Sequence, residues 1–218
     1  MGKGAFINLN GTAKKIKSIY FGINGIARKI KKVYVGVNGV AKQVFSSGKL
    51  VVHPTTAMTS ESSNGYIATC SEHNSSTYAA WHAFDKDIKK GWASKNYSTN
   101  NSPYIQLQLP KALNILKITI VNREHSSYVN GIINANIYGS NVGLTADNSL
   151  DTDDFTRIKE ISGRNGEESG YSSEHDCSST NVKFQYIIIN PTKWTNYNSN
   201  ANSYVAIGEI YITCLEEE

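Results

Sequence analysis

Short runs of β-branched and apolar residues, separated by loops rich in Asn, Ser, Gly and Pro, recur from residue 104 onward. In "YIQLQL" (104–109) apolar residues alternate with glutamines, so Ile105, Leu107 and Leu109 would face the core and the two glutamines the other side of a half-buried strand. This period of two, with no helical period, predicts an all-β sandwich. The expected strands are 104–109, 115–121, 134–140, 155–161, 183–190 and 206–213.

The first 45 residues contain an internal repeat with a unit of 14 residues. The repeat is marked by Asn10-Gly11, Asn24-Gly25 and Asn38-Gly39. Asn-Gly between apolar residues is the strongest short hairpin signal, because a type I′ turn needs positive φ at both central positions. We predict a repetitive β-hairpin or β-meander segment, in which long strands such as Ile26–Val37 join successive turns.

The expected faces of these hairpins follow from the turns, because residues equidistant from a two-residue turn share a face. Around Asn24-Gly25 the apolar face comprises Ile19, Phe21, Ile23, Ile26 and Ile30. Around Asn38-Gly39 it comprises Val33, Val35, Val37, Val40 and Val44. The two faces are opposite sides of the shared strand, which a bend between two layers, a β-prism or an intertwined oligomer would bury. We expect the segment to fold against a partner or against copies of itself.

Charge divides the chain in the same place. Residues 1–49 contain ten Lys and Arg and no acidic residue, whereas the rest contains twelve basic and eighteen acidic residues, a net charge of −6. This asymmetry indicates a basic docking segment for an acidic protein partner or for self-assembly. A lysine-rich edge that prevents strand pairing is the simpler interpretation. Nucleic acid is not expected, because the segment has no regular aromatic platform or recognition helix.

Other features bound the domain organisation. We predict the hairpin segment at 1–45, a linker rich in Ser, Thr, Gly and Pro at 46–56, and the sandwich at 57–218. No apolar run is long enough to span a membrane, and no signal sequence follows Met1. Three cysteines (Cys70, Cys177 and Cys214) are expected to be buried free thiols, with one disulfide pair as the alternative.

Catalytic motifs are not found in the sequence. The five histidines are scattered, with no nucleophile elbow, HExxH or phosphate-binding loop. The acidic stretch Asp151–Asp154 has no partnered acid at a fixed spacing. We predict that the protein is not an enzyme.

Five phrases in a fixed order carry a family resemblance: "AAWHAFDKD", "GWASKNYS", "PYIQLQLP", "NANIYGSN" and "SYVAIGEIYI". Over about residues 57–214 the chain resembles the discoidin-type domain, also called the coagulation factor V/VIII C-type domain, which groups with galactose-binding-like carbohydrate-binding modules. The resemblance implies an eight-stranded jelly-roll β-sandwich that binds through loops at one end and has no catalytic machinery. It also implies that Trp81 and Trp92, inside these phrases, belong to the core.

The same resemblance implies a structural calcium ion near "AFDKD". Its ligands here would be Asp85, Asp87 and Glu209, with nearby backbone carbonyls, and oxygen ligands suit this cation. The chain departs from the family pattern at Lys89 and Lys90. An ion pair from Lys90 to Asp85 or Glu209 is therefore the alternative to calcium.

Sugar-binding residues are implied at three places: the early loop "SEHNSS", the loop after the third strand, and the late loop "PTKWTNYNSN". Polar groups there would bind sugar hydroxyls, and aromatic rings would cover the apolar side of a pyranose. The candidates are Glu72, His73, Asn74, Arg123, Trp194 and Tyr197.

The lysine-rich repeat is similar to segments at the head of virion proteins in phages of Gram-positive bacteria and in phage-tail-like particles. This implies a structural protein of the tail, baseplate or capsid, anchored to other virion proteins through residues 1–45, homo-oligomeric, and binding glycans through the sandwich. Its location would be the virion, with no membrane insertion. The alternatives are a decoration protein that binds no sugar and the carbohydrate-binding module of a bacterial surface protein.

Overall fold

The computed structural model describes residues 6–9, 12–16, 19–23, 26–30, 32–37, 40–46, 48–95, 102–126, 129–180, 182–195 and 204–216 of the chain. It divides into two compact units: unit 1 comprises Met1–Leu50 and Leu215–Glu218, and unit 2 comprises Val51–Cys214. Within the described residues, no helix is both long and apolar enough to cross a membrane.

Unit 1 contains three antiparallel strand pairs, each a separate two-stranded sheet. The pairs are β1 (Phe6–Leu9) with β2 (Thr12–Lys15), β3 (Ile19–Ile23) with β4 (Ile26–Ile30), and β5 (Lys32–Val37) with β6 (Val40–Ser46). In each pair the first strand ends, and the second begins, at the residues that flank an Asn-Gly, as predicted. The three Asn-Gly turns themselves lie outside the described residues. The predicted continuous strand Ile26–Val37 is wrong, because β4 and β5 belong to different sheets.

The register of the hairpins confirms one predicted face and corrects the other. In the β3–β4 pair, Ile19 lies opposite Ile30 and Ile23 opposite Ile26, as expected. In the β5–β6 pair, a register shift next to Tyr34 places Phe45, not Val44, opposite Val33. The side chains of Phe21 and Ile26 are 61% and 60% exposed, so this hairpin buries little apolar surface by itself.

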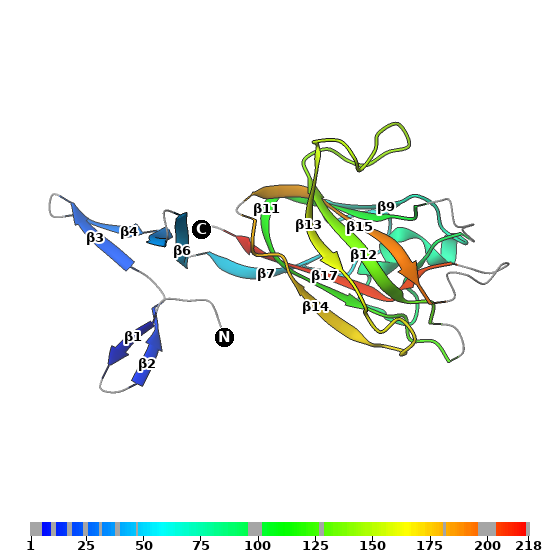
Figure 1. Ribbon diagram of the computed structural model, residues 1–218, viewed down its shortest axis with the longest axis horizontal. Helices are drawn as coiled ribbons and strands as arrows, with labels where there is room; N and C mark the ends of the chain where they lie inside the picture. Colours follow the sequence, from blue (N-terminus) through cyan, green and yellow to red (C-terminus); the bar gives the residue numbers. More distant parts are fainter. Residues whose placement is uncertain are drawn as a thin grey trace. The chain divides into compact units, whose positions relative to one another are not determined.

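The remaining elements form the β-sandwich (Figure 1). They are β7 (Lys49–His53), β8 (Ser62–Ser63), β9 (Tyr66–Cys70), the 3-10 helices η1 (Ser76–Tyr78) and η2 (Ala80–Phe84), β10 (Trp92–Ala93), β11 (Ile105–Val121), β12 (Ile132–Ser140), β13 (Phe155–Ile161), β14 (Ser172–Asp176), β15 (Lys183–Trp194), β16 (Ala206–Ile207) and β17 (Glu209–Glu216). The strand order is β13-β12-β15-β11-β17-β7, with β9 and β14 also paired to β11, β8 paired to β9, and β10 paired to β16. The predicted all-β sandwich is confirmed.

Strand β11 joins two predicted strands, 104–109 and 115–121, into one. Its first residues, Ile105–Gln108, pair with β15 along one edge and with β9 along the other. A register shift follows between Gln108 and Leu113, and residues Lys117–Val121 then pair with β14. The backbone of β11 is therefore hydrogen-bonded to several neighbours, which fixes the position of β9.

The two faces of β11 are both covered at its start. Ile105, Leu107 and Leu109 are buried in the main core, as predicted. Gln106, expected on the polar face, is also buried, because a smaller apolar cluster that includes Leu144 covers it. Its amide donates to Thr69 Oγ1 at 2.9 Å and accepts from the Leu144 N–H at 2.7 Å, so the buried polar group is satisfied.

The predicted linker at 46–56 contains strand β7, which pairs with β17. The stretch "KLVVH" has the alternation of a half-buried strand, with Leu50 and Val52 exposed and His53 buried. The His53 ring contributes to the packing through a hydrogen bond of 2.7 Å between Nδ1 and the Tyr66 hydroxyl. All three cysteines are free thiols, as expected, but only Cys177 and Cys214 are buried, whereas Cys70 is half-buried.

Gly91 and Gly163 allow a matched test of how tightly β10 is packed against β16. Both adopt positive φ, 73° and 65°, which costs a non-glycine residue about 1–2 kcal/mol. A Cβ on Gly91 would lie 2.1 Å from the carbonyl oxygen of Ile207, whereas a Cβ on Gly163 would have nothing within 4 Å.

We therefore expect Gly91→Ala to lower the free energy of unfolding by about 1–3 kcal/mol more than Gly163→Ala does. Urea denaturation of both variants measures the difference. Equal losses of unfolding free energy would show that the turn before β10 accommodates the added Cβ at no extra cost in stability.

Candidate functional site

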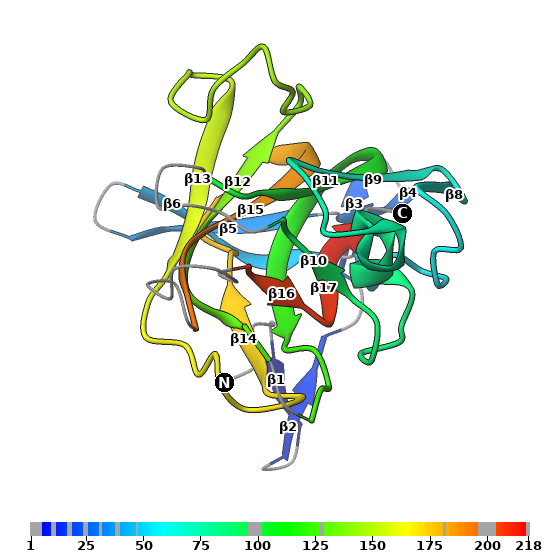
Figure 2. The same cartoon turned by 90° about the vertical axis from the view of Figure 1, so that its right-hand side faces the viewer.

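The chain leaves β9 at one end of the sandwich, the end that faces the viewer in Figure 2, and forms a loop from Ser71 to Ser75. The Ser71 N–H donates to the Tyr104 carbonyl at 3.0 Å, and the Asn74 N–H donates to the Ala93 carbonyl at 2.9 Å. The indole N–H of Trp92, which is buried in the core as predicted, donates to the Glu72 carbonyl at 3.2 Å. These bonds hold the backbone of the loop in place and fix the positions from which its side chains project.

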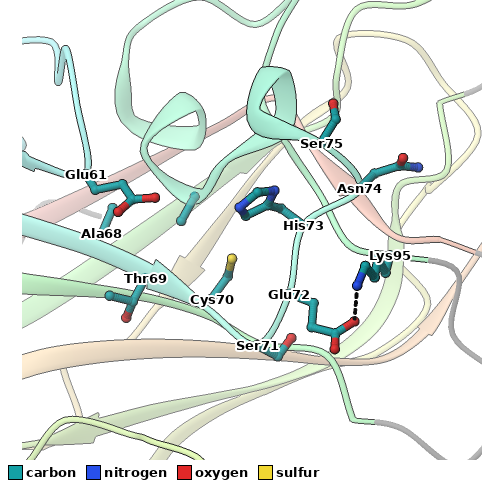
Figure 3. Close-up of a pocket in the computed structure, with 11 residues that line it drawn as sticks. Glu61, Ala68, Thr69, Cys70, Ser71, Glu72, His73, Asn74, Ser75 and Lys95 are labelled. Atoms are coloured by element: carbon teal, nitrogen blue, oxygen red, sulfur yellow. Dashed lines mark ion pairs between the residues drawn. The ribbon is translucent and has the colours of Figure 1, made fainter.

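A hollow of about 520 Å³ lies beside this loop (Figure 3). We call it the β9 hollow. Its polar lining comes from hydroxyl, amide and charged side chains, and its apolar lining from two alanines and a thiol. The lining residues are Glu61, Thr69, Ser71, Glu72, His73, Asn74, Ser75 and Lys95, with Ala68, Cys70 and Ala80. Three predicted ligand-binding residues, Glu72, His73 and Asn74, are thus brought together.

The Glu72 and Lys95 charges in the β9 hollow offset each other, which favours a neutral polar ligand. The carboxylate of Glu72 lies 3.8 Å from the ammonium of Lys95, and both side chains are about half exposed, so the pair is weak. The Nδ1 atom of His73 is buried and has no hydrogen-bond partner among the described residues. Such a group favours a ligand that brings a hydroxyl or carbonyl to it.

Cys70 contributes a neutral surface. Burial, reinforced by the nearby carboxylates of Glu61 and Glu72, raises the pKa of its thiol to about 11, while hydrogen bonding to Trp92 acts in the opposite direction. At neutral pH the thiol is therefore protonated and a poor nucleophile.

Arg123 lies apart from the β9 hollow. Its side chain is only 3% exposed, and its guanidinium lies 5.2 Å from the centre of the Tyr78 ring. Arg123 lies two residues after the end of β11 at Val121, where Gly208 packs closely against its backbone. This arrangement is a cation–π contact that ties η1 to the end of β11.

The aromatic candidates of the late loop do not form a sugar platform in the described part of the chain. Trp194, at the end of β15, is 2% exposed and belongs to the main core. Trp194 pairs with Ile132 of β12, and its burial does not favour the predicted contact with a ligand. Tyr197 lies outside the described residues.

Three acidic residues named as calcium ligands lie close to one another near η2. Asp85 Oδ2 lies 2.7 Å from the Nδ1 atom of His82, and Asp85 Oδ1 accepts a hydrogen bond of 2.8 Å from the Asp87 N–H. The Asp87 carboxylate lies 3.7 Å from the ammonium of Lys90, with both side chains about half exposed. The alternative that Lys90 pairs with Asp85 or Glu209 is wrong, since its observed partner is Asp87.

Glu209 is the most perturbed of these acids. Its side chain is 1% exposed, and neither carboxylate oxygen has a hydrogen-bond partner among the described residues. Burial, reinforced by the charges of Asp85 and Asp87, raises the pKa of Glu209 to about 8, against the opposing effect of the nearby Lys86. A buried carboxylate without partners is costly unless a proton or a cation neutralises it.

The residues around Glu209 fit a hard cation only with help from the backbone. In the parts of the chain that the structure describes, no group of three His, Cys, Asp or Glu side chains is placed to hold a metal ion. Calcium accepts backbone carbonyls as ligands, so the orphaned oxygens of Glu209 would supply the charge and carbonyls the remaining ligands.

The sequence pattern of the F5/8 type C domain matches residues 67–207 of this chain. The chain belongs to the F5/8 type C domain family. None of the curated proteins compared with the chain matches it.

Solved structures show the same fold at low sequence identity. The family 32 carbohydrate-binding module of Clostridium perfringens NanJ, solved with galactose, is 17% identical, with a TM-score of 0.50 over 68% of this chain and 93% of that one. The C. perfringens module CpGH89CBM32-5, solved with GalNAc-β-1,3-galactose, is 18% identical, with a TM-score of 0.52 over 68% and 94%. A fucolectin from striped bass (Morone saxatilis) is 18% identical, with a TM-score of 0.51 over 71% and 47%.

Sequence reasoning missed several residues of the β9 hollow in this F5/8 type C domain. Glu61 directly precedes β8, Thr69 lies in β9, and Lys95 follows β10. A hairpin at Asn64-Gly65 could have been predicted from that turn dipeptide, since both residues adopt positive φ. Lys95 gave no local signal, because it is brought to the loop by the hydrogen bonds between the loop and β10.

We expect calcium to stabilise the domain through Glu209. At pH 8, a saturating calcium concentration should raise the thermal unfolding midpoint by about 5 °C, since ligand binding to the folded state alone adds a few kcal/mol. The variant Glu209→Gln should lose this response, while Glu160→Gln, an exposed acid on β13, should keep it. Differential scanning calorimetry with calcium or a chelator measures both; an equal calcium response in wild type and Glu209→Gln would contradict the assignment.

Proposed function

We propose that the F5/8 type C domain is a carbohydrate-binding module, and that the β9 hollow is its glycan site. The observation that carries the proposal is the buried Nδ1 atom of His73, unpaired among the described residues, in a hollow that mixes hydroxyl and amide groups with an apolar wall. A sugar hydroxyl would satisfy that nitrogen, and the alanines and protonated thiol would contact the apolar face of the ring.

Two similar modules from C. perfringens, solved with galactose and with GalNAc-β-1,3-galactose, make galactose-containing glycans the first ligands to test. Within the β9 hollow, His73 and Asn74 would form hydrogen bonds with sugar hydroxyls. Glu72 would accept a hydrogen bond from a sugar hydroxyl, while Lys95 balances its charge. Arg123 would hold η1 in place through its contact with the Tyr78 ring, and would not touch the sugar.

We also propose a structural calcium ion held by Glu209, by Asp85 or Asp87, and by neighbouring backbone carbonyls. The buried carboxylate of Glu209, whose oxygens accept no hydrogen bond among the described residues, supports this assignment. When bound, calcium would neutralise the buried charge and fix the turn after η2. The backbone of β10 follows this turn, and the β9 loop is hydrogen-bonded to β10.

For unit 1 we propose a role in anchoring the protein to a phage or phage-tail-like particle, through other virion proteins or through copies of itself. Three like hairpins, exposed apolar residues such as Tyr20 and Phe21, and the excess of basic residues support this role. Many copies on one particle would let a weak glycan site hold a surface. The location would then be the virion.

The glycan site predicts a selective effect of one histidine. His73→Ala should weaken glycan binding by about tenfold, because one hydrogen bond to a buried partner is lost. His125→Ala, on the exposed loop after β11, is the matched control and should bind as wild type does. Isothermal titration of the full chain with galactose-containing glycans measures both. Equal affinity of the two variants would contradict a site at the β9 hollow.

The anchoring role predicts where the protein is found in a lysed culture. It should co-purify with phage or tail-like particles after density-gradient centrifugation, as detected by mass spectrometry. Recovery from the cell-envelope fraction alone would instead favour a bacterial surface protein.

A further inference from the structure

A second hollow, of about 420 Å³, adjoins the β9 hollow. We call it the Trp81 hollow. Glu61 and His73 line both hollows, so the two are continuous along the same edge of the domain. Each volume lies within the range of small-molecule sites, about 300–1,000 Å³.

The chemistry of the Trp81 hollow suits a sugar ring. The indole of Trp81, expected in the core, instead packs against the core while still lining the hollow. Its centre lies 3.6 Å from that of the His82 ring, at an interplanar angle of 31°, so the indole packs against that ring. Four residues with hydroxyl side chains line the same hollow: Thr59, Ser60, Ser62 and Ser76.

An aromatic ring rimmed by hydroxyls gives apolar contact on one side of a ligand and hydrogen bonds at its edge. The indole is already packed, so binding would immobilise few additional rotamers. Glu61 and His73, which line both hollows, could hydrogen-bond to two neighbouring sugars at once.

We propose that the two hollows form one site for two consecutive sugar residues of a glycan, with the second residue against Trp81 and with His73 and Glu61 at the junction. The proposal rests on the proposed function and adds the size of its ligand: a disaccharide or a longer chain rather than a single terminal sugar.

The test compares disaccharides with their component monosaccharides on a glycan array, followed by titration of the full chain with the best pair and with galactose and GalNAc-β-1,3-galactose. The disaccharide is expected to bind about tenfold more tightly than either component. Trp81→Leu should remove this gain and leave the monosaccharide affinity unchanged.

Because Trp81→Leu also touches the core, a second variant fills the Trp81 hollow without changing the core. Ser76→Leu, at an exposed position, should likewise remove only the disaccharide gain, whereas Ser179→Leu, an exposed serine that lines neither hollow, should keep it.

The outcomes separate the two proposals. Equal affinity for disaccharide and monosaccharide, or a gain that persists in Ser76→Leu, would overturn the two-residue site and leave the carbohydrate-binding function standing. No binding to any glycan on the array would overturn both.

Discussion

The double pairing of Ile105–Gln108 is the interaction on which the domain and its site depend. β15 takes one edge of this segment and β9 the other, so the backbone groups of four successive residues are used on both sides. Because a one-residue slip would exchange the buried Ile105 and Leu107 with Gln106, the register is strongly fixed. The end of β9, and with it the loop that carries His73, is placed by this ladder.

Hydrogen bonds to its main chain, two from backbone groups and one from the Trp92 indole, hold the loop at the β9 hollow. Tyr104, Ala93 and Trp92 each fix one point of its main chain, which leaves the side chains of Glu72, His73 and Asn74 available to a ligand. The main chain of the loop is therefore fixed, while its three side chains determine which ligand fits. The turn before β10 matters for the same reason, since Gly91 lies directly before β10 and packs against the Ile207 carbonyl, and β10 carries Ala93.

Much of the fold could be predicted from sequence because strand alternation and Asn-Gly turns are local signals. Strand β13 has the predicted bounds, and the start of β11 has the predicted core face. Non-local features could not be predicted. Trp194 lies in a loop-like phrase but is turned inward by pairing with β12, and Gln106 is covered by a cluster from a distant segment. The sequence offered Lys90 several acidic residues as ion-pair partners, and only the geometry of the turn shows that its partner is Asp87.

The central claim is that glycans bind at the β9 hollow and not around Arg123. Amide chemical-shift mapping of the isotopically labelled full chain, titrated with a bound glycan, tests it most directly. The account predicts that the signals of residues 69–75 and Lys95 shift progressively, while those of Arg123 and Glu124 stay in place. Shifts confined to Arg123 and its neighbours, with residues 69–75 unchanged, would contradict it.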